Sequence, residues 1–291
     1  MNSKHQILLV VNPKAGSIDK QELIDSVTEV AESRQWPCKV FETTGEDDDQ
    51  KIEALLKELN PDRLLIAGGD GTINMVAHVL QDYDIPIGIL PAGSANGLAS
   101  NFELPDDLES QIEVALGDHL TPMDHLMVND HTCLHIADLG LNAELIANFE
   151  DATIRGKFGY LLQTIPTLMK TDSPFEFTIE LNNQKYKHTG ILLAIANANQ
   201  YGTGANINPN GIIDDGSFEV LIFKTFDTIE IIRTIYDKVN LDSDFAESYS
   251  TQKVLITASV PVPFQIDGEP MGKTGRVEAH ILDKKLQIAV P

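Results

Sequence analysis

Cysteine and positive charge are scarce in this chain of 291 residues. Its two cysteines, Cys38 and Cys133, fit neither a secreted disulfide scaffold nor a cysteine-based metal site. Lysine and arginine together number 21, against 44 aspartates and glutamates, so the formal net charge is −23. The shortage of positive charge argues against nucleic acid as a partner and against broad electrostatic attachment to anionic lipid.

Long apolar runs are also missing. No run approaches the roughly 20 residues that are needed to cross a bilayer. Residues 1–6 lead directly into the apolar segment Ile7–Val11, without the pattern of a signal peptide. We therefore expect a cytoplasmic protein with no transmembrane segment, whose contacts with a membrane are transient. The oligomeric state cannot be read from the sequence, but the exposed edge strands of the β-sandwich expected in the second half of the chain would allow a homodimer.

Strands and helices alternate in residues 1–122. Apolar spacing predicts helices at Asp19–Ser33 and Asp49–Glu58, and the acidic run 46–49 is expected to be a loop and helix start. The expected strands are Ile7–Val11, Cys38–Glu42, Leu64–Ala67 and Ile87–Leu90. Short strands separated by helices predict a parallel sheet in a Rossmann-like α/β domain.

The pattern changes in residues 123–291, where many segments alternate in polarity between turn residues. Only Tyr160–Met169 and Thr228–Val239 have helical spacing. The expected strands are Thr132–Ile136, Glu176–Leu181, Lys185–His188, Ile191–Ala196, Ser217–Phe223, Lys253–Ala258, Phe264–Ile266, Arg276–Ile281 and Gln287–Val290. These strands predict a β-sandwich as the second domain. Whether the last strand belongs to this domain or returns to the first one is not decided by the pattern.

Three glycine-bearing turns follow strands of the first domain, at residues 12–16, 68–72 and 91–97. The carboxyl ends of parallel strands share one edge, so the three turns should converge there and bind an anion such as phosphate. Asp70 is unusual beside phosphate, and it suits Mg²⁺ binding or proton acceptance. Asn12 either bonds a nucleotide or braces the next loop. Asn96 either contacts phosphate or caps the next helix.

Two polar turns of the second domain carry carboxylates. Asp214 and Asp215 precede Gly216, where they either bind a cation through oxygen or simply form the turn. Asp267 and Glu269 flank a glycine at a strand end. Either of these two serves as a general base, or the segment is an ordinary hairpin turn.

The order of these motifs along the chain is informative. They are Asn12-Pro13-x-x-Gly16, Gly68-Gly69-Asp70-Gly71-Thr72, Gly93-Ser94-Ala95-Asn96, 137–144, 155–160, 197–216 and Asp267-Gly268-Glu269. The chain therefore resembles the diacylglycerol kinase catalytic-domain family, in its bacterial lipid kinase branch, over nearly its full length. NAD kinases and 6-phosphofructokinases share only the second motif, so the ordered set is the specific signal.

The resemblance implies ATP-dependent phosphorylation of a lipid hydroxyl, such as that of diacylglycerol or phosphatidylglycerol, in a cleft between the domains. The implied nucleotide-binding residues are Asn12, Pro13, Lys14, Ala15, Gly16, Thr43, Gly68, Gly69, Asp70, Gly71, Thr72, Ile73, Asn74 and Ser94, with Thr44 as the alternative to Thr43. The implied Mg²⁺ ligands are the Asp215 carboxylate and the carbonyls of Ile212 and Ser217. The implied catalytic residues are Glu269 as proton acceptor, Asp70 near the transferring phosphate, and Asp267.

The chain departs from the family pattern at several positions. Gly97 replaces an aspartate, Ser94 replaces a threonine, Met75 replaces a glutamate, and Leu141-Asn142 replaces Phe-Asp. Loss of the carboxylate at position 97 removes a candidate member of a metal–water network. The alternatives are an NAD kinase-like enzyme that phosphorylates a soluble hydroxyl, and a catalytically silent regulator that binds nucleotide or lipid.

Overall fold

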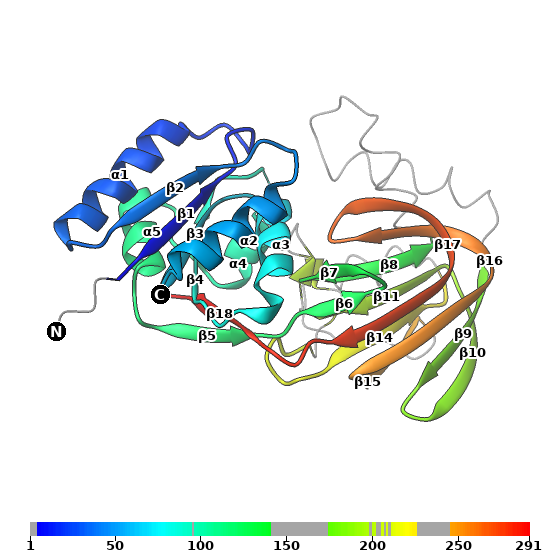
Figure 1. The fold of residues 1–291 in the computed structure, drawn as a ribbon. Helices are drawn as coiled ribbons and strands as arrows, with labels where there is room; N and C mark the ends of the chain where they lie inside the picture. The colour runs from blue at the N-terminus through cyan, green and yellow to red at the C-terminus, as the bar shows by residue number, and fades with distance from the viewer. Residues whose placement is uncertain are drawn as a thin grey trace. The chain divides into compact units, whose positions relative to one another are not determined.

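The computed structural model describes residues 5–94, 96–140, 174–197, 200–201, 205–206, 208, 211–225 and 245–291. The chain forms two compact units (Figure 1). The first consists chiefly of Met1–Asp124 and Leu282–Pro291, and the second of His125–Tyr201 and Ala205–Ile281. The first unit is α/β and the second is built of β-strands, which confirms the predicted fold class.

The first unit contains a six-stranded sheet with the order β2-β1-β3-β4-β18-β5. Its strands are β1 (Ile7–Val11), β2 (Cys38–Glu42), β3 (Arg63–Gly68), β4 (Ile87–Pro91), β5 (Leu120–Met123) and β18 (Leu286–Ala289). The first five strands in that order run parallel, and β5 is antiparallel to β18. The C-terminal strand β18 therefore belongs to the first unit, beside β4.

Helices connect most of these strands (Figure 1), and their apolar residues are buried in the core of the unit. They are α1 (Lys20–Ser33), α2 (Asp48–Leu59), α3 (Asp70–Val79), α4 (Gly97–Asn101) and α5 (Leu108–Ala115), with the short 3₁₀ helix η1 (Leu80–Asp82). Leu23 and Val27 of α1 share one core cluster with Ile112 of α5. Asp19 caps α1 by accepting hydrogen bonds from the amides of Gln21 and Glu22, which is why the helix begins there.

The second unit contains a ten-stranded antiparallel sheet, whose described residues bury one large and one smaller apolar cluster. Its strands are β6 (Leu126–Val128), β7 (His131–Cys133), β8 (Ile136–Gly140), β9 (Phe175–Leu181), β10 (Gln184–Gly190), β11 (Leu192–Ala196), β14 (Phe218–Phe223), β15 (Ala246–Thr251), β16 (Lys253–Ile266) and β17 (Glu269–Ile281), beside the separate pair β12 (Gln200–Tyr201) and β13 (Ala205–Asn206). The long strand β16 pairs with β9 through its first half and with β8 through its last residues.

Several predicted strand boundaries in the second unit are wrong, and β17 begins at Glu269 where Arg276 was expected. The expected strand Thr132–Ile136 is divided into β7 and β8, because the amides of Leu134, His135 and Ile136 bind the Asp267 carboxylate. The expected strands at 253–258 and 264–266 are one strand, β16, whose register against β17 shifts between them. A bulge lets a strand bend without ending, so the change of pattern at this point is not a strand boundary.

Part of the sequence-based interpretation lies outside the described residues. This applies to the helical patterns at 160–169 and 228–239, to the motif at 155–160 and to Leu141-Asn142. Among the helices in the described part of the chain, none is long and apolar enough to cross a membrane.

Candidate phosphate cradle and carboxylate turns

The three glycine-bearing loops of the first unit pack against one another through their backbones. A Cβ atom placed on Gly16 would lie 2.4 Å from the Ala92 carbonyl oxygen, and one on Gly93 would lie 2.4 Å from the Gly69 Cα. Gly16 also has a φ of +54°, which disfavours other residues. Glycine is therefore required where the loops meet. We call residues 12–16, 68–74 and 92–97 together the three-loop cradle.

Asn12 braces the neighbouring loop, which is one of its two predicted roles. Its Nδ2 donates to Oγ1 of the buried Thr72 at 3.1 Å, and its Oδ1 accepts the Lys14 amide at 3.0 Å. Lys20 fixes the same loop by donating from Nζ to the carbonyls of Ala15 and Ile18. The first loop is thus held in one shape before any ligand arrives.

Helix α4 is capped by the side chain of Asp70 and not by that of Asn96, for which capping was one of two predicted roles. Asn96 Oδ1 accepts the Gly93 amide at 2.8 Å, and its Nδ2 donates to the Gly93 carbonyl, so this side chain closes its own loop. The Asp70 carboxylate instead accepts the amides of Gly97 and Leu98 at 2.9 and 3.0 Å. Asp70 therefore caps α4 and ties the second loop to the third.

Several groups on the cradle remain open. The amides of Asp70 and Gly71 begin α3 and make no hydrogen bond with any described residue. A Cβ on Gly71 would meet nothing within 4 Å. The exposed hydroxyl of Ser94 and the exposed ammonium of Lys14 likewise have no partner in the described part of the chain. Open amides at a helix N-terminus suit an anion, and Lys14 adds a positive charge to the first loop of the cradle.

The remaining predicted nucleotide-binding residues differ in what they can offer. Ile73 is packed in the core and Gly68 is buried under Thr72, so only their backbones are available. Pro13 is exposed and Ala15 is half-buried at the first loop. Asn74 is half-buried in α3 and already has an interaction.

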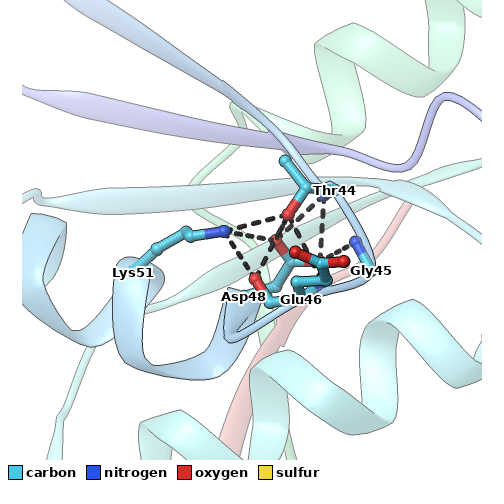
Figure 2. Close-up of polar contacts among 5 residues, drawn as sticks. All are labelled: Thr44, Gly45, Glu46, Asp48 and Lys51. Atoms are coloured by element: carbon cyan, nitrogen blue, oxygen red, sulfur yellow. Dashed lines mark hydrogen bonds and ion pairs between the residues drawn. The ribbon is translucent and has the colours of Figure 1, made fainter.

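The loop between β2 and α2 distinguishes Thr43 from Thr44. The buried Asp48 carboxylate accepts the Thr44 amide and hydroxyl and, at 2.7 Å, the Gly45 amide (Figure 2). Lys51 donates to the Thr44 hydroxyl at 2.9 Å. The Thr43 amide bonds the Val11 carbonyl, while its hydroxyl has no partner among the described residues. Of the two threonines, Thr43, which directly follows β2, is therefore the one whose hydroxyl is available to a ligand.

Asp48 is expected to stabilise the first unit in a pH-dependent way. Burial opposes its ionisation, but the hydrogen bonds from Thr44 and Gly45 outweigh burial and lower its pKa. A lowered folded-state pKa adds stability above the unfolded value of about 3.9, and this is lost as pH falls through the folded value. Asp48→Asn should cost roughly 1.5–3 kcal/mol at pH 7 and much less at pH 3, measured by urea unfolding.

The exposed Asp49 of the same helical turn provides the control. Asp49→Asn should leave the free energy of unfolding within about 0.5 kcal/mol of the original at both pH values. An Asp48→Asn penalty that is equal at pH 7 and pH 3 would show that the carboxylate charge is not the source of the stability.

In the second unit, the turn before β14 places Asp215 as an exposed side chain whose Oδ1 accepts the Ser217 amide at 2.9 Å. Ile212 is 54% exposed. No three histidine, cysteine, aspartate or glutamate side chains gather into a metal-binding group anywhere among the described residues. Sequence analysis missed the neighbouring Glu219, which is buried and accepts from Asn208 Nδ2 at 2.6 Å. Burial raises the pKa of Glu219, and the charge of Asp215 adds to this.

The segment from Ile266 to Glu269 is a tight hairpin turn. Asp267 and Gly268 both have positive φ, at 50° and 91°, as a two-residue type I′ turn requires. The Asp267 carboxylate accepts the amides of Leu134, His135 and Ile136 at 2.7–3.0 Å. Glu269 is exposed and makes no hydrogen bond within the described ranges. Of the two predicted bases, Asp267 is occupied as an anchor and Glu269 is open.

Two family models match the chain. Residues 6–128 match the diacylglycerol kinase catalytic domain, and residues 136–290 match the YegS C-terminal NAD kinase beta sandwich-like domain. A protein from Shewanella frigidimarina named probable lipid kinase YegS-like is 26% identical over 242 residues, which cover 80% of this chain and 77% of the relative.

Solved structures show the same fold. A diacylglycerol kinase structure from Bacillus anthracis superposes with a TM-score of 0.77 at 18% identity, covering 100% of this chain and 98% of the other. An NAD kinase from Archaeoglobus fulgidus in complex with ATP has a TM-score of 0.54 at 12% identity, with 98% and 93% covered. At these identities the likeness concerns the fold.

Proposed function

Because the chain belongs to the family that joins a diacylglycerol kinase catalytic domain to a YegS C-terminal domain, a family of lipid kinases, we propose that it transfers the γ-phosphoryl group of ATP to a lipid hydroxyl. Diacylglycerol and phosphatidylglycerol are the proposed acceptors. The protein reaches them by transient contact with the membrane surface.

The observation that carries this proposal is the three-loop cradle. Its loops are fixed by backbone packing and by the Asn12–Thr72 hydrogen bond, yet the amides of Asp70 and Gly71 stay open. A rigid set of donors that needs no rearrangement suits the charge of a transferring phosphoryl group. The free ammonium of Lys14 adds positive charge at the same loops, in a chain whose net charge is −23.

The proposed reaction assigns one task to each group. The acceptor oxygen forms a bond to the γ-phosphorus while the bond from that phosphorus to the ADP oxygen breaks. Glu269 accepts the proton of the lipid hydroxyl, since its carboxylate is exposed and free of other donors. Asp70 contributes by holding the second and third loops together, because its two carboxylate oxygens accept hydrogen bonds from the amides that begin α4.

Mg²⁺ fits the turn at residues 212–217 by its donor set. The Asp215 carboxylate and the carbonyls of Ile212 and Ser217 are all oxygen donors, which is the ligand type that Mg²⁺ prefers, and water and phosphate commonly complete its shell. One Asp215 oxygen bonds the Ser217 amide, which orients the other. The ion would supply charge neutralisation for the phosphates.

The direct test incubates the purified full chain with γ-labelled ATP and, in parallel, diacylglycerol, phosphatidylglycerol, NAD or total lipid extract. We expect a labelled lipid product, identified by mass spectrometry, and none from NAD. Label in NADP would instead support an NAD kinase-like enzyme. Tight ATP binding without any product would support a silent regulator and overturn the proposal.

The two threonines after β2 should respond differently to loss of the hydroxyl. Thr43→Val should weaken ATP binding roughly fivefold, about 1 kcal/mol, because one ligand hydrogen bond is lost while the fold keeps its own bonds. Thr44→Val should instead lower the free energy of unfolding, because it removes partners of Asp48 and Lys51. Calorimetric titration and urea unfolding measure the two effects, and the reverse pattern would assign the nucleotide contact to Thr44.

A further inference from the structure

The hairpin that carries Glu269 is held from its inner side by a chain of buried side chains. Gln265 is completely buried at the end of β16, and its Oε1 accepts the Gly268 amide at 2.7 Å. Its Nε2 donates a hydrogen bond to Oδ2 of Asp138, which is also completely buried, on the neighbouring strand β8. The register places these two residues directly opposite each other.

The chemistry of Asp138 determines how Gln265 is oriented. The Gln265 amide donates through its nitrogen to Asp138, and an amide group that does so turns its carbonyl oxygen to the opposite side. The amide oxygen then faces the other way, toward the Gly268 N–H, as observed. With a neutral apolar residue in place of Asp138, nothing would select this orientation of the amide.

The hairpin needs such support because its own ladder is weak at this point. The residue opposite Gln265 on β17 is Pro270, which has no N–H to donate to the ladder. The tip beyond it contains Gly268, and Glu269 is exposed. Asp267 fixes one side of the tip through three amides, and Gln265 fixes the other through the Gly268 amide.

We infer that Asp138 and Gln265 are positioning residues for phosphoryl transfer, which hold the turn so that the Glu269 carboxylate meets the acceptor hydroxyl. This inference rests on the proposed function, in which Glu269 is the base. Neither residue touches the substrate. Their effect is therefore expected in turnover and not in the binding of ATP or lipid, since a misplacement of about 1 Å in a reacting group costs on the order of 100-fold in rate.

Reversing the polarity of the pair tests the inference. Gln265→Glu places two buried carboxylates face to face, so we expect kcat to fall at least about tenfold with the KM for ATP and lipid within about threefold. Asp138→Asn combined with Gln265→Glu restores a donor opposite an acceptor and keeps an acceptor for the Gly268 amide. This double variant should recover kcat to within about threefold of the original.

Thr251→Val is the matched control, because Thr251 is a buried residue of the same unit whose hydroxyl bonds Asn182 and the Lys253 carbonyl. It should lower the melting temperature without changing kcat. An unchanged kcat in Gln265→Glu, or a double variant as slow as the single one, would overturn the inference.

Hydrogen exchange of the Gly268 amide separates the inference from the proposed function. Gln265→Leu should make this amide exchange at least about tenfold faster, while Thr251→Val should leave it unchanged. If the original protein phosphorylates no lipid, the proposed function fails, and the exchange result alone decides whether the buried pair anchors the turn. Unchanged exchange would overturn the anchoring.

Discussion

Replacing Glu269 by glutamine is expected to reduce lipid phosphorylation at least about a hundredfold, while ATP binds within about twofold of its original affinity. Glutamine keeps the size of the side chain but cannot accept the hydroxyl proton. The side chain is exposed and makes no hydrogen bond within the described ranges, so the fold should not change. Steady-state turnover with labelled ATP and calorimetric titration of ATP measure the two quantities.

Asp267→Asn is the matched control, because the second carboxylate of the same turn is already occupied. Removing one of its acceptor oxygens should lower the free energy of unfolding by about 2 kcal/mol, since three amides compete for what remains. Turnover per folded molecule should fall about tenfold at most, through displacement of the turn, against at least about a hundredfold in Glu269→Gln. If Glu269→Gln turns over like the original, Glu269 is not the base and our assignment is wrong.

The fold class could be predicted because it depends on the period of apolar residues. Segments such as Ile7–Val11 and Leu64–Ala67 are buried throughout, as expected for the interior of a parallel sheet. The meeting of three glycine-bearing loops could also be predicted, since strand ends of one polarity share an edge. Both inferences use local pattern and a general rule of topology.

Long-range polar contacts could not be predicted in this way. Asp70 bonds amides 27 and 28 residues away, and Asp267 bonds amides more than 130 residues away. A carboxylate in a glycine-rich turn has the same local sequence whether it caps a distant helix or faces a ligand. The local sequence therefore indicates that these aspartates are candidate functional residues, but it does not reveal that distant backbone amides donate hydrogen bonds to their carboxylates.

The second large effect is expected from replacing Gly71, because the fold does not require glycine at this position. A methyl group there meets no protein atom within 4 Å, and alanine favours a helix over glycine by about 0.5–1 kcal/mol. Gly71→Ala should thus raise the free energy of unfolding slightly. It should weaken ATP binding at least about tenfold, since the methyl group lies beside the open amides that begin α3.

The same substitution at Gly93 should have the opposite outcome. There the methyl group would lie 2.4 Å from the Gly69 Cα, so the loops must separate, at a cost of about 1–3 kcal/mol in the free energy of unfolding. Urea unfolding and the rise in melting temperature on adding ATP measure both variants. A Gly71→Ala protein that is stabilised by ATP as strongly as the original would mean that phosphate does not approach these amides. The glycine of α3 would then have no explanation in either the fold or the ligand.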